Sequence, residues 1–591
     1  MNTFDNSTSG TSASTASRSE PEKVPKSATA GDLCGDHSGD PASEPILRIE
    51  GLSVALPAGA DREYAVEELS YEVSPGEILC VVGESGSGKS MAANTVMGLL
   101  PKGVRPVAGR VMFEGEDVLT LDEKRHRALR GKKIGMIFQE PMTALNPLMR
   151  IGDQIAEVFE AHGELKGAER QARALELLKE VRLPQPERAI RAYPFELSGG
   201  QRQRVMIAMA LALEPKLLIA DEPTTALDVT TQAQILELIA DLQRRHHMAV
   251  MFITHDFGVV AEIANRVCVM RHGRIVEIGR RDEVLDNPRH DYTRALIEAI
   301  PSDAAPPERE PMAPTPILEV RNLNRVFRSR GGLFKPSREV RALDDVSFTL
   351  SRGETIGIVG ESGSGKSTLG RCVVRLERPD SGEILLGGED LSALKGDALR
   401  RQRHRVQMVF QDPYASLNPR TRVGMAIAQG PIANGVPRDQ ALAKADELLE
   451  LVGLGGSADR FPHEFSGGQR QRIGIARALA LDPELIVADE AVSALDVSIQ
   501  AQVLELLEDL KQRFSLSLLF ITHDLRVAAQ ICDRIIVMQK GRIVEQGSAQ
   551  EVFTRPQADY TRELLAAIPG RDKTTDDKTT DDKTSKEETS H

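Results

Sequence analysis

One octapeptide, Gly-Glu-Ser-Gly-Ser-Gly-Lys-Ser, occurs twice in this sequence, at residues 83–90 and again at 360–367. Further pairs follow in the same order. Phe-Gln-x-Pro begins at residues 138 and 410, and three more pairs are 268 residues apart. These are Ser-Gly-Gly-Gln-Arg-Gln-Arg, Asp-Glu and Ile-Thr-His-Asp, which begin at residues 198, 221 and 253 of the first half. A long sequence that repeats so many segments in one order is predicted to contain two copies of one structural module.

We place the two copies at residues 46–300 and 316–569. Between them, residues 301–315 contain five prolines and scattered charges, a composition typical of a short, semi-extended linker. Residues 1–45 are rich in Ser, Thr, Gly and Pro and lack the apolar core of a signal peptide, and residues 570–591 are polar and repetitive. Both end segments are expected to be disordered and to lie outside the folded domains.

Each copy alternates short apolar runs with helical patterns, which predicts an α/β fold with a mainly parallel sheet. Residues 77–83 and 216–221 are examples of such runs. From residue 151 to about residue 181 the apolar residues fall instead at helical spacing, and residues 445–452 repeat that spacing in the second copy. A helical subdomain is therefore expected in each copy.

Composition limits the kinds of protein that fit. The formal net charge of −13 argues against a general nucleic-acid binder, which needs a basic surface. No window approaches the roughly 18 to 20 apolar residues of a membrane-spanning helix. The five cysteines are scattered without Cys-x-x-Cys spacing, which favours a reducing compartment over a disulfide framework or a zinc site.

The repeated octapeptide follows an apolar run and precedes a helical pattern, the context of a phosphate-binding P-loop. The loop's N–H groups surround phosphates, the lysine reaches the β and γ oxygens, and the last serine coordinates magnesium. A flexible Gly/Ser loop is the alternative, which the flanking elements and the second copy disfavour. The predicted nucleotide-binding residues are Gly83, Glu84, Ser85, Gly86, Ser87, Gly88, Lys89, Ser90, Gly360, Glu361, Ser362, Gly363, Ser364, Gly365, Lys366, Ser367 and Thr368.

An acidic pair directly follows an apolar strand in each copy, at the sheet edge where open α/β folds bind ligands. The predicted magnesium ligands here are Asp221 and Asp489. The adjacent Glu222 and Glu490 are positioned to orient or deprotonate an attacking water. A strand-terminal turn with solvated acids is the alternative, which a P-loop earlier in the same copy makes less attractive.

Ser-Gly-Gly-Gln begins a helical pattern in each copy. The serine can cap the helix while the glycines let a phosphate approach the exposed N–H groups, which predicts a second anion site per copy. Taken alone, the geometry is explained more simply by a capping serine without a ligand. The residues concerned are Ser198, Gly199, Gly200, Gln201, Ser466, Gly467, Gly468 and Gln469.

Taken in order, the P-loop, Phe-Gln-x-Pro, Ser-Gly-Gly-Gln, Asp-Glu followed by Ala-Leu-Asp, and Thr-His resemble the ATP-binding cassette of ABC transporters. The resemblance covers nearly all of residues 46–569. It implies two tandem nucleotide-binding domains, each a P-loop NTPase core with a helical subdomain. It also implies a head-to-tail sandwich in which each ATP lies between the P-loop of one cassette and the Ser-Gly-Gly-Gln helix of the other.

The resemblance also implies roles for individual residues. Gln139 and Gln411 would sense magnesium and water and contact a transmembrane partner, and His255 and His523 would contact the γ-phosphate. Site one would pair the first P-loop with Ser466 and site two would pair the second with Ser198. An aromatic ring should stack on each adenine, and we expect Phe327 in the second copy and Tyr64 in the first, although core packing would explain either ring nearly as well.

Longer segments, such as Asp-Tyr-Thr-Arg at residues 291 and 559, are similar to importer ATPases of the peptide/nickel type. This resemblance implies an ATPase for peptide, oligopeptide or glutathione import on the cytoplasmic face of the membrane. Its partners would be two permeases and an extracytoplasmic solute-binding protein. No cysteine lies between Cys268 and Cys372, so no iron–sulfur cluster is expected.

A soluble twin-cassette ATPase acting on ribosomes or DNA is the alternative. Basic runs at residues 123–133 and 400–405 could contact RNA, but such runs more often form solvated faces. The short, proline-rich linker also differs from the long charged arm of those proteins. The expectation is therefore a protein that does not bind nucleic acid.

Overall fold

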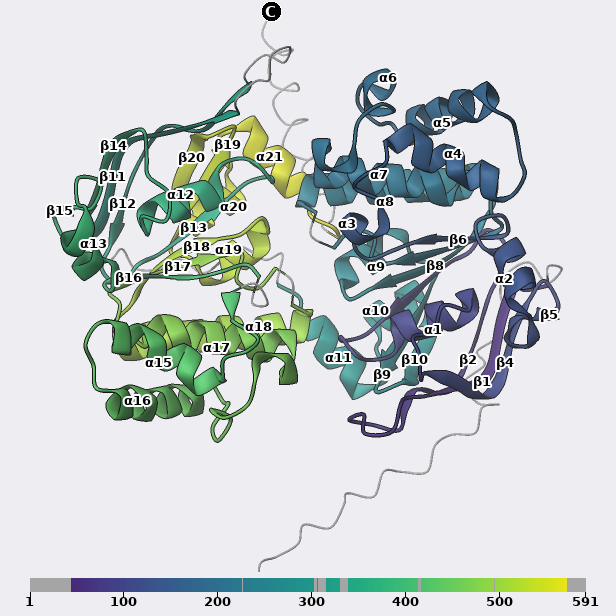
Figure 1. Ribbon diagram of the computed structural model, residues 1–591, viewed down its shortest axis with the longest axis horizontal. Coiled ribbons are helices and arrows are strands. Elements are labelled where there is room, and N and C mark those ends of the chain that lie inside the picture. Colours follow the sequence, from purple (N-terminus) through teal and green to yellow (C-terminus); the bar gives the residue numbers. More distant parts are fainter. Residues whose placement is uncertain are drawn as a thin grey trace, which may run out of the picture. The chain divides into compact units, whose positions relative to one another are not determined.

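The structure is a computed structural model that describes residues 44–225, 227–301, 306, 315–329, 338–412, 416–493 and 495–570. The disorder expected for the two end segments, and most of the expected linker, lie outside these residues. Both copies are described over nearly their whole length, and each contains the same two sheets (Figure 1).

A six-stranded, mainly parallel sheet forms the centre of the first copy, in the order β10-β9-β3-β8-β7-β6. Five neighbouring strands, β9, β3, β8, β7 and β6, pair in parallel, and β10 pairs antiparallel with β9 at the edge. The alternation of apolar runs predicts such a mainly parallel sheet. The strands are β3 (Ile78–Val82), β6 (Ile134–Ile137), β7 (Leu217–Asp221), β8 (Ala249–Thr254), β9 (Arg266–Arg271) and β10 (Arg274–Arg280).

Strand β3 shows why this sheet is buried on both faces. Ile78, Cys80 and Val82 pack into one hydrophobic cluster, and the alternate residues Leu79 and Val81 pack into another. Because successive side chains of a strand point to opposite faces, a strand covered on both sides is apolar throughout. The two clusters are completed by helices α1 (Lys89–Met97), α8 (Val229–His246), α9 (Phe257–Ile263), α10 (Arg281–Asp286) and α11 (Asp291–Glu298).

A second, four-stranded antiparallel sheet, ordered β2-β1-β4-β5, was not predicted. Most side chains of β4 are exposed, so this strand lacks the buried–exposed alternation that marks a strand in sequence. Register shifts in the pairing of β1 with β2 weaken the pattern further. The strands are β1 (Leu47–Ala55), β2 (Tyr64–Val73), β4 (Arg105–Phe113) and β5 (Glu116–Asp117).

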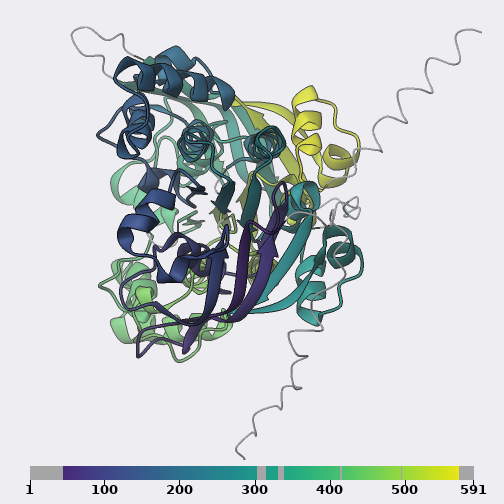
Figure 2. The same ribbon diagram turned by 90° about the vertical axis from the view of Figure 1, so that its right-hand side faces the viewer.

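The predicted helical subdomain is confirmed. Helix α4 (Ile151–Ala161) packs on α5 (Ala168–Glu180), and both contact α7 (Gly199–Ala210). Within the first copy, α4 and α5 lie at the end away from β1 and β2 (Figures 1 and 2). The apolar stripe is buried as its spacing requires, since Ile151, Ile155 and Phe159 are all inaccessible. Shorter helices connect these elements: η1 (Val118–Thr120), α2 (Glu123–Leu129), α3 (Pro141–Ala144), α6 (Pro186–Ala189) and η2 (Pro194–Glu196).

The second copy repeats both sheets, in the orders β16-β17-β18-β13-β19-β20 and β12-β11-β14-β15. Its strands are β11 (Pro316–Ser329), β12 (Arg338–Ser351), β13 (Thr355–Val359), β14 (Ser381–Leu386), β15 (Glu389–Asp390), β16 (Val406–Val409), β17 (Leu485–Asp489), β18 (Ser517–Ile521), β19 (Arg534–Gln539) and β20 (Arg542–Ser548). Its helices are α12 (Lys366–Val373), α13 (Gly396–Arg403), α15 (Val423–Ala433), α16 (Arg438–Leu451), η3 (Pro462–Glu464), α17 (Gly467–Leu479), α18 (Val497–Phe514), α19 (Leu525–Ile531), α20 (Ala549–Thr554) and α21 (Asp559–Ala566).

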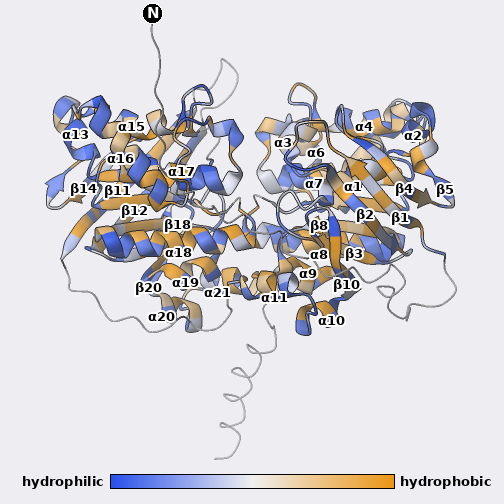
Figure 3. Ribbon diagram, turned by 90° about the horizontal axis from the view of Figure 1, so that it is seen from below, coloured by the Kyte–Doolittle hydropathy of each residue, from blue (hydrophilic) through white to orange (hydrophobic). Residues whose placement is uncertain are grey.

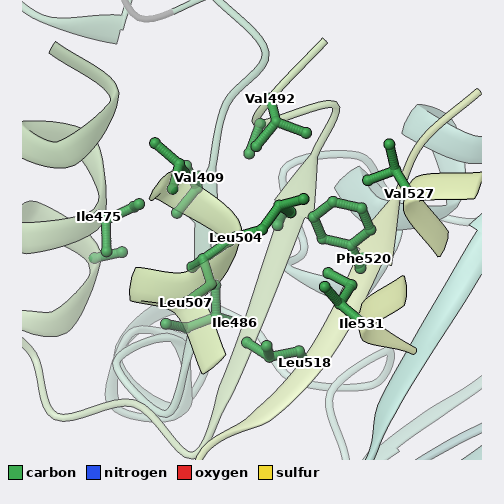
Figure 4. Close-up of a cluster of buried hydrophobic side chains, with 14 of the residues drawn as sticks. Val409, Ile475, Ile486, Val492, Leu504, Leu507, Leu518, Phe520, Val527 and Ile531 are labelled. Atoms are coloured by element: carbon green, nitrogen blue, oxygen red, sulfur yellow. The ribbon is translucent and has the colours of Figure 1, made fainter. Parts of the chain in front are cut away.

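Two hydrophobic clusters cover the two faces of the parallel sheet in the second copy, and one of them lies between the sheet and the helices α17 and α18. Figure 4 shows Ile486, Leu518 and Phe520 of the sheet beside Leu504 and Leu507 of α18. Figure 3 shows the same separation by hydropathy, with apolar residues concentrated in the central strands and polar ones in α13, none of whose residues is buried. Within the described part of the chain, no helix has both the length and the hydrophobicity to cross a membrane.

Candidate functional site

Each P-loop lies between the first strand of the parallel sheet and the helix that follows it, as predicted. Gly88, with φ of 103°, precedes α1 without a side-chain cap, so the first N–H groups of that helix are available to an anion. A Cβ on Gly88 would lie 2.6 Å from the carbonyl oxygen of Ala65, and one on Gly365 would lie 2.3 Å from that of Ala342. Only glycine therefore allows the loop to pass this close to the antiparallel sheet.

The P-loop lysines point back into their own loops. Lys89 Nζ donates to the carbonyl oxygens of Gly83 at 2.6 Å and Glu84 at 3.0 Å, and Lys366 makes the equivalent bonds to Gly360 and Glu361 at 2.6 and 2.9 Å. Burial lowers the pKa of both lysines, while nearby carboxylates act in the opposite direction. Each ammonium group is thus held at the centre of the loop, where a phosphate would lie.

The strand-terminal acids lie beside the P-loop serines, as predicted. Ser90 Oγ donates to Asp221 Oδ1 at 2.9 Å, and Ser367 Oγ donates to Asp489 Oδ1 at 2.8 Å. Burial raises the pKa of both aspartates. A hydroxyl and a carboxylate from two different elements therefore meet at the carboxyl edge of the sheet.

The neighbouring glutamates lie in a small polar cluster. Gln139 Nε2 donates to Glu222 Oε2 at 2.9 Å, and His255 Nδ1 lies 3.4 Å from the same oxygen. Although burial acts in the opposite direction, the hydrogen bond and charge of His255 lower the pKa of Glu222 to about 2. The backbone of Glu222 has φ of 46°, a conformation that costs free energy outside glycine and is often found at functional sites.

The second copy repeats this cluster with small differences. Gln411 Nε2 donates to Glu490 Oε2 at 2.7 Å, and His523 Nδ1 lies 3.8 Å from that oxygen. Burial raises the pKa of Glu490, but the interactions with His523, Lys366 and Ser493 together outweigh it and the net shift is downward. Both glutamates therefore remain ionised at neutral pH.

The serine of each Ser-Gly-Gly-Gln segment caps its helix, α7 or α17, and the anion site expected there stays a prediction. The Ser198 side chain accepts from the N–H of Gln201 at 3.3 Å, and Gln201 returns a bond to the N–H of Ser198 at 3.0 Å. Ser466 and Gln469 repeat both distances. Both segments thus form reciprocal capping boxes.

Hydrogen bonds join each P-loop to the other copy. Ser85 donates its N–H to Asp496 Oδ1 at 2.9 Å, and the Ser498 hydroxyl donates to the carboxylate of Glu84. In the reverse direction, Thr230 Oγ1 donates to Glu361 Oε1 at 2.6 Å. A cavity of about 240 Å³ beside the second P-loop is lined both by Lys366 and Ser367 and by residues 225, 227 and 228 of the first copy.

The aspartate of the first copy is placed like Asp496. Burial raises the pKa of Asp228, but hydrogen bonds lower it overall, and one of these comes from the backbone N–H of Ser362 in the second P-loop. Each Ala-Leu-Asp segment therefore places its aspartate, Asp228 or Asp496, in contact with the P-loop of the other copy. In the sequence these segments were only part of the ordered set of motifs.

The structure leaves the predicted adenine contacts untested. Tyr64 is the first residue of β2, next to Ala65, whose carbonyl lies against the P-loop. Phe327 lies in β11 and is 39% exposed, and the guanidinium of Arg325 lies 4.7 Å from its ring centre. Sequence reasoning missed Arg62, whose guanidinium donates to the carbonyl oxygen of Gly86. An arginine in a loop between two strands gave no signal of that contact.

Comparisons with known proteins agree with the duplicated site. A family described as "ABC transporter" matches residues 66–225 and 343–493, just over half of the chain. A second family, "Oligopeptide/dipeptide transporter, C-terminal region", matches residues 276–338 and 544–591.

Curated relatives match most of the chain, and two of them illustrate the similarity. The "Peptidoglycan transport ATP-binding protein YejF" of Agrobacterium fabrum is 49% identical over 530 residues, which cover 89% of this chain and 96% of that protein. The "Glutathione import ATP-binding protein GsiA" of Escherichia coli O157:H7 is 48% identical over 557 residues, or 89% of each chain.

Among solved structures, the chain is similar to the ATP-binding cassette MJ0796 in a dimeric state bound to ADP and Pi. The identity is 28%, the coverage is 39% of this chain and 98% of that one, and the TM-score is 0.36. The family matches and the identity to full-length relatives establish the family by themselves. The chain belongs to the ABC transporter family and carries two ATP-binding cassettes, each followed by an oligopeptide/dipeptide transporter C-terminal region.

Proposed function

We propose that this chain hydrolyses ATP at two sites shared between its cassettes, and so energises an importer of peptides. The names of the relatives, which specify glutathione import and peptidoglycan transport, support a peptide-like cargo. The matched C-terminal regions, described for oligopeptide and dipeptide transporters, support the same class. The protein would bind two permeases at the cytoplasmic face of the membrane, and a solute-binding protein on the other side would deliver the cargo.

The contacts between copies are the observation that carries this proposal. A cassette that closed its own site would not need its P-loop bonded to the other copy, whereas Ser85 bonds to Asp496 and Thr230 bonds to Glu361. Site one would combine Lys89, Ser90, Gln139, Asp221, Glu222 and His255 with Ser466 and Gly468. Site two would combine Lys366, Ser367, Gln411, Asp489, Glu490 and His523 with Ser198 and Gly200.

The residues at each sheet edge fit a magnesium ion. Magnesium prefers oxygen ligands and is usually bound through one or two carboxylates plus the substrate phosphates. Ser90 and Asp221 present a hydroxyl and a carboxylate 2.9 Å apart, and the Gln139 amide is bonded to Glu222, the residue that follows Asp221. Ser367, Asp489 and Gln411 form the same set in site two. When bound, the ion would offset charge on the β and γ phosphates.

The protein groups around Glu222 would position the attacking water. With its pKa held near 2, the carboxylate is ionised at neutral pH, accepts a hydrogen bond from Gln139, and would accept another from the attacking water. So low a pKa makes Glu222 a weak base, so orientation of the water contributes more than proton removal. Lys89 would hold the β and γ oxygens, and His255 would donate to the γ-phosphate.

A Ser466→Arg substitution tests whether the sites are shared. Ser466 belongs to the second cassette, but a bulky side chain at the start of α17 should abolish nucleotide trapping at the Lys89 loop of the first cassette. Photolabelling with an ATP analogue under turnover conditions, followed by peptide mapping, reads each loop separately. Ser198→Arg is the reciprocal control and should affect the Lys366 loop first. Loss confined to the loop of the substituted cassette would show that each cassette closes its own site.

Four exposed apolar side chains, which we call the apolar patch, support the permease proposal. They lie on residues 138–148 and 193–196, two segments that meet where the Arg150 guanidinium lies over the Tyr193 ring. Phe138, Met142, Leu148 and Phe195 are all exposed, Leu148 by 85% and Phe195 by 65%. Large apolar groups gathered on a surface mark a protein interface more often than isolated ones do. The residues that correspond to Leu148 and Phe195 in the second copy are Arg420 and His463, so the two faces differ in chemistry.

Substitution within the patch tests the docking face. Leu148→Arg should lower transport and co-purification with the permeases at least tenfold. ATP hydrolysis by the isolated chain should stay at the parental rate, because the Leu148 side chain is 85% exposed and Leu148 is not among the residues assigned to either site. An exposed residue on another face, Val107, supplies the control Val107→Arg. Normal transport by Leu148→Arg would exclude this face as the permease contact.

A further inference from the structure

Tyr292 and Tyr560 connect the C-terminal regions to the P-loops. Each is the second residue of a short helix, α11 or α21, and each side chain is more than nine-tenths buried. The N–H of Glu84 donates to Tyr292 Oη at 3.2 Å, across 208 residues of sequence. The N–H of Glu361 donates to Tyr560 Oη at 3.0 Å, across 199 residues. The same contact is thus made independently in both copies.

Glu84 is the point at which contacts from three parts of the structure meet. In the first copy, the N–H of Glu84 is held by Tyr292, and its carbonyl oxygen is held by Lys89 at 3.0 Å. Its carboxylate accepts from Ser498 of the other cassette. Fixing this residue therefore fixes the entry of the loop, the direction of the lysine and the contact with the other cassette.

The tyrosines are themselves held in place by the strands before them. Glu277 of β10 accepts from the N–H groups of Arg289 at 2.8 Å and His290 at 3.1 Å, just before α11 begins. Glu545 of β20 makes the equivalent bonds ahead of α21 to Gln557 at 2.7 Å and Ala558 at 3.0 Å. Each tyrosine thus projects from a helix start anchored to the sheet.

The first copy adds a contact that the second lacks. The guanidinium of Arg271 lies 4.7 Å from the centre of the Tyr292 ring, whereas residue 539, which corresponds to it, is a glutamine. Burial raises the pKa of both tyrosines to about 12, so both hydroxyls stay neutral at physiological pH. A neutral hydroxyl oxygen is a suitable acceptor for the backbone N–H.

We propose that Tyr292 and Tyr560 are positioning residues, each of which holds the P-loop of its own cassette in the conformation that receives the nucleotide phosphates. The proposal rests on the assignment of the P-loops as nucleotide sites. It gives the C-terminal regions, which lie far from the loops in sequence, a direct part in nucleotide binding.

The test removes a single hydroxyl. Tyr292→Phe should weaken ATP binding at the first P-loop about two- to tenfold, the effect of one hydrogen bond, and raise KM with little change in kcat. Amide hydrogen exchange of the peptide spanning residues 83–90 should become faster, while that of 360–367 should not change. Tyr560→Phe should show the reverse pattern. Tyr71→Phe is the matched control, because Tyr71 is also buried and its hydroxyl contacts Met251 instead of a P-loop.

The outcomes separate this proposal from the proposed function. Exchange and ATP binding at 83–90 that match the parent protein in Tyr292→Phe would overturn the positioning role. A loss of thermal stability in Tyr292→Phe equal to that of Tyr71→Phe, without a change confined to 83–90, would also overturn it. Lys89→Ala tests the nucleotide site separately. Full ATP binding by that variant would refute the nucleotide site, while hydrogen exchange of residues 83–90 in Tyr292→Phe would still test the positioning role.

Discussion

Glu222 and Glu490 sit in matching clusters of a glutamine and a histidine, so both proposed sites contain the carboxylate to which we assign the orientation of water. We expect Glu490→Gln to trap ATP at the second P-loop and to reduce turnover of the whole protein about 100-fold or more, because an amide cannot take the proton or hold the water in the same way. Steady-state ATPase assays with photolabelling measure both effects. Glu447→Gln, which changes an exposed carboxylate in α16, should be neutral. Parental turnover in Glu490→Gln would mean that the second site is degenerate.

The charge of Glu222 also sets the protonation of its histidine. Burial lowers the pKa of His255, but the adjacent carboxylate raises it above the ordinary value. Glu222→Gln removes the negative charge and leaves the burial, so the pKa of His255 should fall and the imidazolium should be lost at a lower pH. An NMR titration of the protein without nucleotide or magnesium follows this ring directly. An unchanged pKa would mean that Asp256 and Asp496, not Glu222, stabilise the cation.

At the scale of elements, the start of α7 packs closely against the start of α8. A Cβ on Gly200 would lie 2.4 Å from Thr231 Cγ2, whereas a Cβ on Gly199 would meet only Leu227 at 3.8 Å. Gly200, the second residue after the capping serine, is therefore the glycine that packing requires, whatever it contributes to nucleotide binding. Gly468 has the same relation to Ile499, at 2.3 Å.

We expect Gly200→Ala to destabilise the protein by about 1–3 kcal/mol, the usual cost of overpacking. Gly199→Ala should leave the thermal midpoint unchanged or slightly raised, since alanine favours helix. Adding Thr231→Ser to Gly200→Ala removes the clashing methyl group and should recover most of the loss. Equal midpoints for the two single variants would show that the helices separate without cost.

Elements with a strong periodic signal were predictable. The parallel strands are apolar on both faces, as at Val81 and its neighbours, and the buried residues of α4, such as Ile155, follow helical spacing. Both kinds of element could therefore be predicted from the sequence. The antiparallel sheet could not, because the exposed side chains of β4 carry no pattern. Contacts set by chain folding were also hidden: nothing in the sequence places the hydroxyl of Tyr292 on the N–H of Glu84.

At the scale of the whole molecule, the ends of the chain pose a separate question. The composition of residues 1–44 and 572–591 is poor in apolar residues. It predicts that deleting either segment should leave ATPase activity and the thermal midpoint nearly unchanged. The C-terminal family match reaches residue 591, which makes the second deletion the more demanding test. A fall in the midpoint of several degrees after either deletion would mean that the segment docks on a cassette.

The difference between the two exposed faces has a consequence for assembly. Two separate polypeptides would assort into like pairs as well as mixed ones, and only the mixed pairs would offer one face with Leu148 and Phe195 and one with Arg420 and His463. Because the two cassettes are covalently linked, like pairs cannot replace mixed ones within a molecule. Every molecule therefore carries one face of each kind at any cellular concentration. The duplicated halves are thereby free to diverge, and under the proposed function a transporter built on this chain would accept two unlike permeases in a fixed order.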